Sequence, residues 1–184
     1  MTKKAGLAAL LVISYQFVSA QAATPPQTQT TQVTPLAPKP EAPYQKSPTI
    51  PQFHLLKADS ATYLTRDDIK KHRPTLIMYF SPDCDHCKHQ TEFILAENDK
   101  FRNIEIVMAT YQPFDEMKDF ITHYKLTDHP NIKVGRDDKF FFAPFYKIAS
   151  LPYLALYDKD GNLITTFEGT HPATTILAAF DQKK

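Results

Sequence analysis

Hydrophobic and polar positions change their spacing several times along the chain, and these changes predict a series of strands and helices. Two runs, TLIMYF at 75–80 and NIEIVMATY at 103–111, are almost continuously apolar over the length of a strand, which is typical of strands buried on both faces. From Cys84 the apolar spacing becomes helical for about four turns, and Pro113 opens a second helical stretch at 114–124. This strand, helix, strand, helix order predicts a parallel pairing with a right-handed crossover.

The flanks of this core carry shorter signals. PQFHLL at 51–56 reads as a short edge strand, and Thr65 is a good N-cap for a seven-residue helix after it. Near the end of the chain, strand-like runs at 152–157 and 162–169 are joined by a turn that contains an Asp-Gly pair, which predicts a β-hairpin. A closing helix is expected at 173–182.

The segment between residues 126 and 148 gives the weakest signal. NIKVG at 131–135 has the composition of a strand, and DDKFFFAPFYKI at 137–148 predicts a helix that is broken near Pro144. We expect its aromatic side chains to lie in the core, and a substrate groove is the alternative. These side chains are Phe140, Phe141, Phe142, Phe145 and Tyr146.

Residues 1–22 have the pattern of a secretory signal peptide. Lys3 and Lys4 form a basic region, residues 5–17 form a short apolar region, and Ala20 or Ala22 supplies a small residue before a cut. The apolar run is shorter than the roughly 20 residues that span a bilayer, so cleavage is favoured over retention as an anchor. No cysteine lies near the cut, which excludes a lipid anchor there. We therefore expect the protein to be exported to the periplasm or cell envelope.

Residues 23–51 form a segment dense in Pro, Thr and Gln, with too few apolar residues to build a core. We expect a disordered linker, which is either a tether for the domain or a remnant of processing. The composition changes at residue 52. The sequence therefore predicts one globular domain over residues 52–184.

The composition excludes some classes of function. The net charge is +1 and the basic residues are scattered, which gives no reason to expect nucleic acid as a partner. With four glycines in the chain, neither a dinucleotide fingerprint nor a phosphate loop is present. The chemistry therefore has to come from the stretch SPDCDHCKHQ at 81–90, which holds both cysteines.

Cys84 and Cys87 are better suited to reactivity than to structural cross-linking. Export places them in an oxidising compartment, but a disulfide across two intervening residues closes too short a loop to stabilise the fold much. Cys84 falls at the start of a predicted helix, where unpaired N–H groups and the helix dipole favour its thiolate. Cys87 lies one turn further in and is expected to be more buried. We predict that Cys84 is the attacking thiol and Cys87 the resolving thiol.

Asp85 and His86, between the two cysteines, are expected to tune the redox potential. A protonated His86 would stabilise the Cys84 thiolate and make the disulfide more oxidising, whereas Asp85 would oppose it. The net sign of these two effects stays open.

The motifs resemble a known superfamily. A strand ending in YFSPDCDHCKHQTEFI, a later buried strand and then ASLPYLALYDKDGNLI resemble the thioredoxin superfamily, and more closely the exported TlpA/ResA-type thiol:disulfide oxidoreductases. Over residues 52–184 the resemblance implies an α/β, thioredoxin-like fold, with a central mixed sheet and helices on both faces. It also implies that the bond before Pro152 is cis and that the backbone of Leu151 receives an extended substrate segment. The tryptophan usual before the first cysteine is absent, since Asp83 precedes Cys84.

Two alternatives use the same residues. Soft thiolates with His86 and His89 could bind copper or zinc for metal delivery, although four ligands so close on one helix fit a tetrahedral site poorly. A peroxiredoxin-like peroxidase would need a proline where Ile77 stands, four residues before Ser81.

The sequence thus predicts a thiol:disulfide oxidoreductase that exchanges disulfides with envelope proteins and needs no cofactor or metal beyond the redox-active pair Cys84–Cys87. Its partners would be protein thiols and disulfides. The residues do not set the direction of electron flow. We take a reductant as the working hypothesis, and a reductant in an oxidising compartment needs a membrane electron donor.

Overall fold

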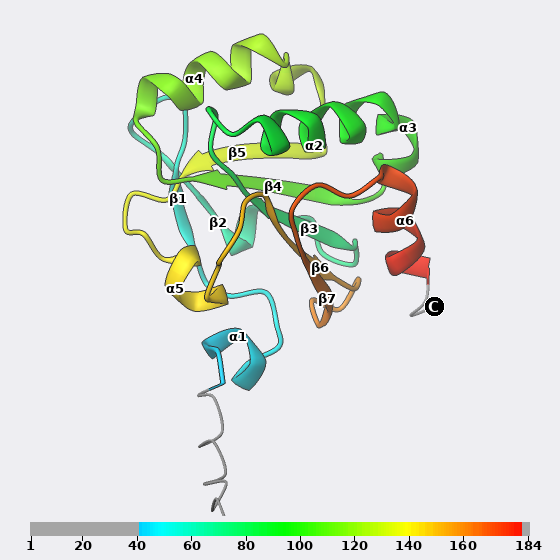
Figure 1. Cartoon of the computed structure of the whole chain (residues 1–184). Helices are drawn as coiled ribbons and strands as arrows, with labels where there is room; N and C mark the ends of the chain where they lie inside the picture. The colour runs from blue at the N-terminus through cyan, green and yellow to red at the C-terminus, as the bar shows by residue number, and fades with distance from the viewer. Residues whose placement is uncertain (1–40, 182–184) are drawn as a thin grey trace, which may run out of the picture. The chain divides into compact units, whose positions relative to one another are not determined.

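A computed structural model describes residues 41–181, which form a seven-stranded sheet with helices on both faces (Figure 1). The strand order is β2-β1-β5-β4-β3-β6-β7, and only the β3–β4 and β4–β5 pairs are parallel. This mixed sheet confirms the predicted α/β fold class. The strands are β1 (His54–Leu56), β2 (Tyr63–Thr65), β3 (Thr75–Tyr79), β4 (Glu105–Thr110), β5 (Ile132–Arg136), β6 (Tyr153–Tyr157) and β7 (Leu163–Glu168).

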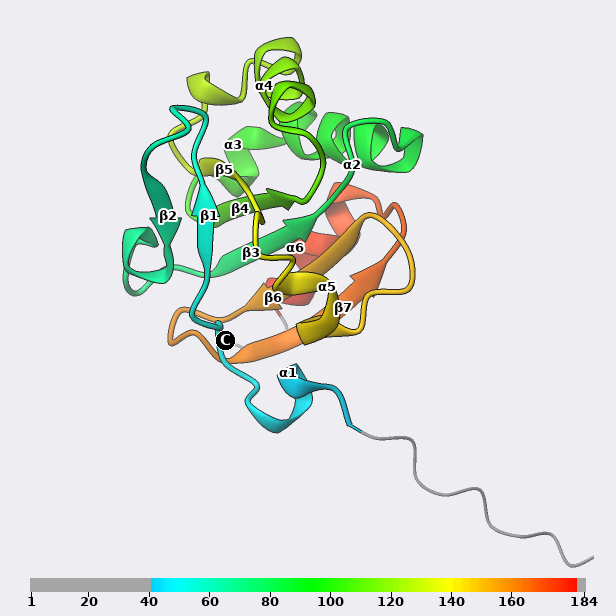
Figure 2. The same cartoon turned by 90° about the vertical axis from the view of Figure 1, so that its left-hand side faces the viewer.

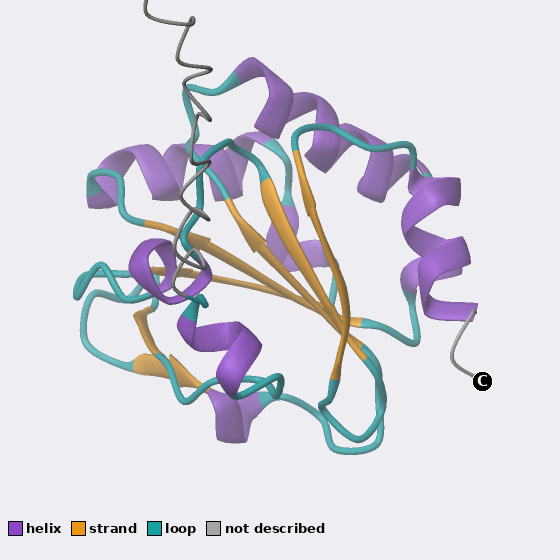
Figure 3. Ribbon diagram, turned by 60° about the horizontal axis from the view of Figure 1, so that its bottom comes forward, coloured by secondary structure: helices purple, strands orange, loops and turns teal. Residues whose placement is uncertain are grey.

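The central strands β3, β4 and β6 are buried at every position, as their continuous apolar runs predict. Tyr79, the last residue of β3, pairs with Ala109 on one side and with Tyr153 on the other. Figure 3 shows these strands fanning out between the helices. The segment after β3, the end of β4 and the segment before β6 therefore lie together at one end of the central strands.

The helices divide between the two faces of the sheet. Buried side chains of α2 (Asp85–Ala96), α3 (Asn98–Phe101), α4 (Phe114–His123) and α6 (Ala173–Asp181) pack against one face. The other face is covered by α5 (Phe142–Tyr146) and by the segment that contains α1 (Pro43–Lys46). In Figure 1, α2 and α4 lie above the sheet, and α5 and α1 lie below it. No helix within residues 41–181 is long and apolar enough to cross a membrane.

The β1–β2 hairpin forms one edge of the sheet (Figure 2) and includes a strand that the sequence did not predict. The helix predicted after Thr65 is wrong. Only a single 3₁₀ turn, η1 (Arg66–Asp68), forms there, and Ile69 is already extended and buried. His72 has a left-handed backbone and Arg73 precedes a proline, so neither residue can continue a helix.

The segment 41–51 belongs to the folded domain, so the fold begins before the predicted boundary at residue 52. The N–H of Ile50 donates to the Gly161 carbonyl at 2.9 Å, and the N–H of Leu163 donates to the Pro48 carbonyl at 2.7 Å. Ala42 and Ile50 are buried. The predicted signal peptide and most of the predicted linker lie outside the described residues and stay predictions.

The aromatic segment 140–146 is mostly core. Phe142 and Tyr146 are buried, whereas Phe140 is 51% exposed. The predicted break near Pro144 is wrong, because Pro144 is the third residue of α5, and a first-turn residue has no helical partner for an N–H. The start of α5 is instead fixed by buried Asp137, whose carboxylate accepts the N–H groups of Phe141 and Phe142 at 2.8 and 2.9 Å.

Candidate active site

Cys84 lies at the N-cap of α2, immediately beyond the end of β3. Its N–H donates to the Ser81 carbonyl at 3.1 Å, which closes the turn between strand and helix. Its carbonyl accepts the N–H groups of Cys87 and Lys88 at 2.9 and 3.0 Å, which are the first bonds of the helix. Cys84 is partly exposed, and its side chain makes no capping hydrogen bond to the first turn of α2.

Cys87, the third residue of α2, has no exposed surface and packs in the core with Met78 and Phe80. Both thiols are free, and they lie within hydrogen-bonding contact of each other. Burial raises the pKa of the Cys87 thiol well above its ordinary value, and contact with Cys84 adds to the shift, while the Ser81 backbone opposes it. The pair is therefore asymmetric, with one accessible sulfur and one enclosed thiol that keeps its proton.

This asymmetry predicts a specific loss of stability at alkaline pH in the reduced protein. An unfolded chain releases the Cys87 proton above pH 9, whereas the folded chain retains it, so rising pH favours unfolding. Relative to Cys87→Ala, reduced wild type should lose about 1.4 kcal/mol per pH unit above that value. Urea unfolding at pH 8, 9 and 10 measures the difference. The buried tyrosines contribute equally to both proteins, so a pH-independent difference would contradict the buried thiol.

The segment before β6 lies against the cysteine pair. The carbonyl oxygen of Leu151 is 4.0 Å from the Cys84 Sγ. The Leu151–Pro152 peptide bond is cis, the isomer that the resemblance implied, and Pro152 is buried. Because Tyr153 pairs with Tyr79 in the sheet, the strands themselves place Leu151 beside the turn that carries Cys84.

The two residues between the cysteines are exposed on the first turn of α2. Asp85 accepts a hydrogen bond from Lys88 at 3.0 Å, and this bond, followed by the charge of Lys88, lowers the pKa of the Asp85 carboxyl. The backbone carbonyl of His86 accepts the Thr170 hydroxyl at 2.9 Å. The negative charge of Asp85 is therefore partly compensated by Lys88.

Gln90 is a site residue that the sequence did not single out. It is fully buried on α2, one turn after Cys87, and its Oε1 accepts the N–H of His171 at 2.8 Å. Together with the Thr170 bond, this contact fastens the loop before α6 to the first turns of α2. The available signal was a polar residue at helical spacing from Cys87, on the face that the cysteine shares with the core.

The metal alternative finds no geometric support in the described part of the chain. His86 and His89 are both exposed, and His89 contacts Glu92 at 3.1 Å. Within residues 41–181, no three His, Cys, Asp or Glu side chains converge so that they could hold a metal ion. Ile77, which stands where a peroxiredoxin carries proline, is buried in the middle of β3.

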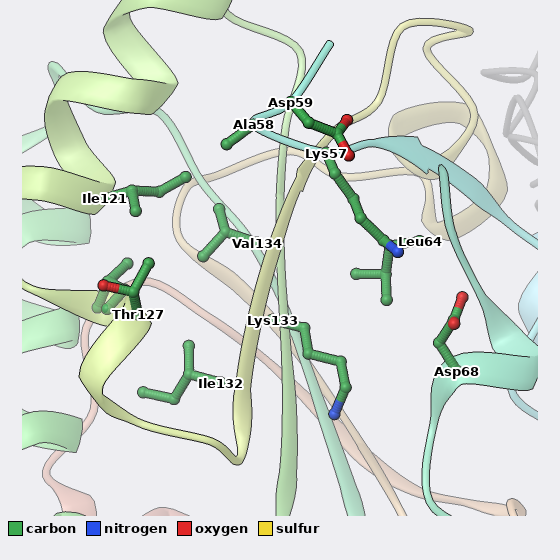
Figure 4. Close-up of a pocket in the computed structure, with 11 residues that line it drawn as sticks. Lys57, Ala58, Asp59, Leu64, Asp68, Ile121, Thr127, Ile132, Lys133 and Val134 are labelled. Carbon is green, nitrogen blue, oxygen red and sulfur yellow. The ribbon is translucent and has the colours of Figure 1, made fainter. Parts of the chain in front are cut away.

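Two hollows differ in where they lie relative to the cysteines. An apolar hollow of about 440 Å³ lies between the β1–β2 hairpin and α4, where Figure 4 shows Ile121, Ile132 and Val134 along its wall. None of its lining residues belongs to the turn that carries Cys84. A second hollow, of about 470 Å³, lies between α2 and α4 and includes Pro82 and Asp83, directly before Cys84. The second hollow is thus the one that includes part of the turn before Cys84.

A family model described as a thioredoxin-like domain matches residues 66–184, which include the cysteine turn, the Leu151–Pro152 bond and the closing hairpin. The chain belongs to this thioredoxin-like family. The superfamily resemblance inferred from the motifs is thereby confirmed. No protein of curated function matches the sequence.

Solved structures show the same thioredoxin-like fold at low sequence identity. A secreted disulfide oxidoreductase of Mycobacterium tuberculosis, homologous to Escherichia coli DsbE, shares 15% identity at a TM-score of 0.59, covering 71% of this chain and 96% of its own. StoA from Bacillus subtilis shares 19% identity at a TM-score of 0.56, covering 72% and 98%. A thiol-disulfide oxidoreductase from Bacteroides fragilis shares 17% at 0.58, covering 71% and 97%. At these identities the likeness establishes the thioredoxin-like fold.

Proposed function

We propose that this thioredoxin-like chain is a thiol:disulfide oxidoreductase that reduces disulfides of client proteins in the cell envelope. The observation that carries the proposal is the asymmetry of the pair. Cys84 is the partly exposed N-cap residue of α2, and its Sγ lies beside the Leu151 carbonyl, while the Cys87 thiol is enclosed within contact of it. Membership of the thioredoxin-like family and the named activities of structures with this fold support the same chemistry.

The exchange runs in two steps. The Cys84 thiolate attacks one sulfur of the client disulfide, which forms a Cys84–client disulfide and releases the other client sulfur as a thiolate. Cys87 then loses its proton and attacks the Cys84 sulfur, which closes the Cys84–Cys87 disulfide and releases the second client thiolate. Two electrons and the Cys87 proton pass to the client, whose two sulfurs are left as one thiol and one thiolate, and the chain is left oxidised. No group beyond the cysteine pair takes part.

The proposed surroundings of this reaction follow from the sequence. The predicted signal peptide exports the chain, and the predicted linker lets the domain reach its partners. A reductant in an oxidising compartment has to be re-reduced, so the second partner is a membrane protein that donates electrons. The backbone of Leu151 and the hollow beside Asp83 are the surfaces on which a client segment would lie.

The equilibrium reduction potential of Cys84–Cys87, measured in defined thiol buffers, tests this function. We expect a value below about −230 mV, in the range of thioredoxin. His86→Ala should lower the potential because a protonated imidazole there would stabilise the Cys84 thiolate, and Asp85→Asn should raise it, so the two variants control for each other. A value between about −120 and −180 mV would reverse the direction of electron flow. Failure to form the disulfide under mild oxidation would sink the redox proposal itself.

A further inference from the structure

A third hollow, with a charged lining, lies at the opposite end of β3 from the cysteines. It has a volume of about 390 Å³ and is bounded by the segment between η1 and β3 and by the β6–β7 turn. Thr75, the first residue of β3, forms part of its lining, whereas Cys84 follows the end of the same strand. A ligand here would therefore bind away from the thiol chemistry.

The lining of this hollow carries an excess of positive charge. Five basic residues face two acidic ones, Asp67 and Asp160. Three of the basic side chains are partly neutralised, since Lys70 and Arg73 contact Glu105 at 3.6 and 3.4 Å and Lys159 contacts Asp160 at 3.1 Å. The remaining two, Arg66 and Lys71, form no ion pair within residues 41–181. For a chain of net charge +1, this is a local concentration of uncompensated cations.

Thr75 supplies an independent observation. The residue has no exposed surface, and its Oγ1 has no hydrogen-bond partner among the described residues. Its position is fixed on both sides by sheet pairing with Glu105 and Tyr157. Buried hydroxyls are nearly always paired, because an unpaired one loses its bonds to water without replacement. A buried hydroxyl without a partner, on a residue that lines a cationic hollow, fits an anionic acceptor.

We propose that this hollow binds the phosphate group of a phosphate ester. A phosphate carries up to two negative charges and several acceptor oxygens, which match the planar guanidinium of Arg66, the ammonium of Lys71 and the hydroxyl of Thr75. The volume lies in the range of small-molecule sites, which leaves room for the group that the phosphate esterifies. That group can belong to a soluble metabolite or to a phospholipid headgroup, and the same donors would bind either.

Calorimetric titration of the full-length chain with glycerol 1-phosphate tests the site. Thr75→Val keeps the shape of the side chain and removes the donor, and we expect affinity to fall about 10-fold. Lys71→Gln should lower affinity by a similar factor, while the matched charge change Lys118→Gln on α4 should alter it less than about 2-fold. Because Thr75→Val removes an unpaired buried hydroxyl, it should not lower the melting temperature of the unliganded protein.

Other outcomes would overturn the site. They are no binding by wild type, unchanged affinity in Thr75→Val, or equal losses in Lys71→Gln and Lys118→Gln, which would indicate general attraction of anions. Sedimentation with phosphatidylglycerol vesicles, compared with phosphatidylcholine vesicles, identifies the source. If the wild type sediments with the vesicles and both Thr75→Val and Lys71→Gln weaken this binding, the ligand is a lipid headgroup. If the chain binds glycerol 1-phosphate but does not sediment with the vesicles, the ligand is a soluble ester. Vesicle binding through an apolar N-terminus would be the same in wild type and variants. The test therefore uses the difference in sedimentation between wild type and the variants.

Discussion

Replacing Cys84 with serine should lower the rate of disulfide reduction by at least about 10³-fold, the scale seen when a catalytic nucleophile is removed. A serine hydroxyl stays protonated at neutral pH and does not attack a disulfide sulfur. Cys84 is the partly exposed thiol, whereas Cys87 is enclosed by the core and cannot replace it as the first attacker. The rate at which the reduced chain opens the disulfides of a small client protein measures the effect.

Cys87→Ala provides the matched variant, because it removes the proposed resolving thiol and leaves the proposed attacking one. We expect it to accumulate a mixed disulfide between Cys84 and the client, visible by non-reducing electrophoresis and dispersed by added thiol. The double variant Cys84→Ser/Cys87→Ala should trap nothing. Normal turnover by Cys87→Ala, or equal trapping by Cys84→Ser, would contradict the assigned order of attack. Near-normal unfolding free energies in both single variants would separate chemistry from misfolding.

The central part of the fold was predictable because its signals are local. β3, β4 and β6 are apolar at nearly every position, and α2 and α4 repeat their apolar residues at helical spacing, so element types follow from the pattern. The position of Cys84 follows equally, since a strand, a turn and a helix start leave one place for it. Its neighbour across the fold, Leu151, was implied by family resemblance and not by any local signal.

The partners of β1 were not predictable, because they are set by contacts distant in sequence. The strand was predicted at the edge of the sheet, but it lies between β2 and β5. A Cβ at Gly135 of β5 would lie 2.6 Å from the Cβ of Leu55, so a glycine lets β1 approach β5, but nothing in NIKVG announces β1 as the neighbour. The burial of Ile50 likewise depends on the Gly161 turn, which is remote in the chain. Composition alone assigned this residue to the linker.

The same limit applied to the candidate site. Gln90 sits on an otherwise core-facing side of α2, and its partner, the N–H of His171, is supplied by the loop before α6. A sequence pattern shows the odd polar residue but not the loop whose N–H bonds its Oε1, and the Gln90 Nε2 has no partner among the described residues. The Thr75 hydroxyl is the reverse case, since the sequence shows an ordinary strand residue and the fold leaves its Oγ1 without a partner in the described part of the chain.

Phe142→Ala should destabilise the domain by about 3–5 kcal/mol, a large share of the 5–15 kcal/mol that holds a typical domain together. The ring has no exposed surface and lies 5.5 Å from Phe53, 6.1 Å from Tyr79 and 5.7 Å from Tyr146, measured between ring centroids. Removing it leaves a cavity that these rings cannot fill, because the Asp137 carboxylate fixes the backbone of residue 142. Urea unfolding measures the loss.

Phe140→Ala is the matched control for this prediction. Phe140 is two residues away in the same aromatic run, but its ring is 51% exposed and meets Tyr111 edge-on at 5.4 Å. Its truncation should cost no more than about 0.5 kcal/mol. If both variants lose the same stability, the division of this segment into a core half and a surface half is wrong. If Phe140→Ala instead slows reduction of a client at unchanged stability, the exposed ring contacts the client, and the substrate-groove alternative holds for Phe140 while Phe142 remains a core residue.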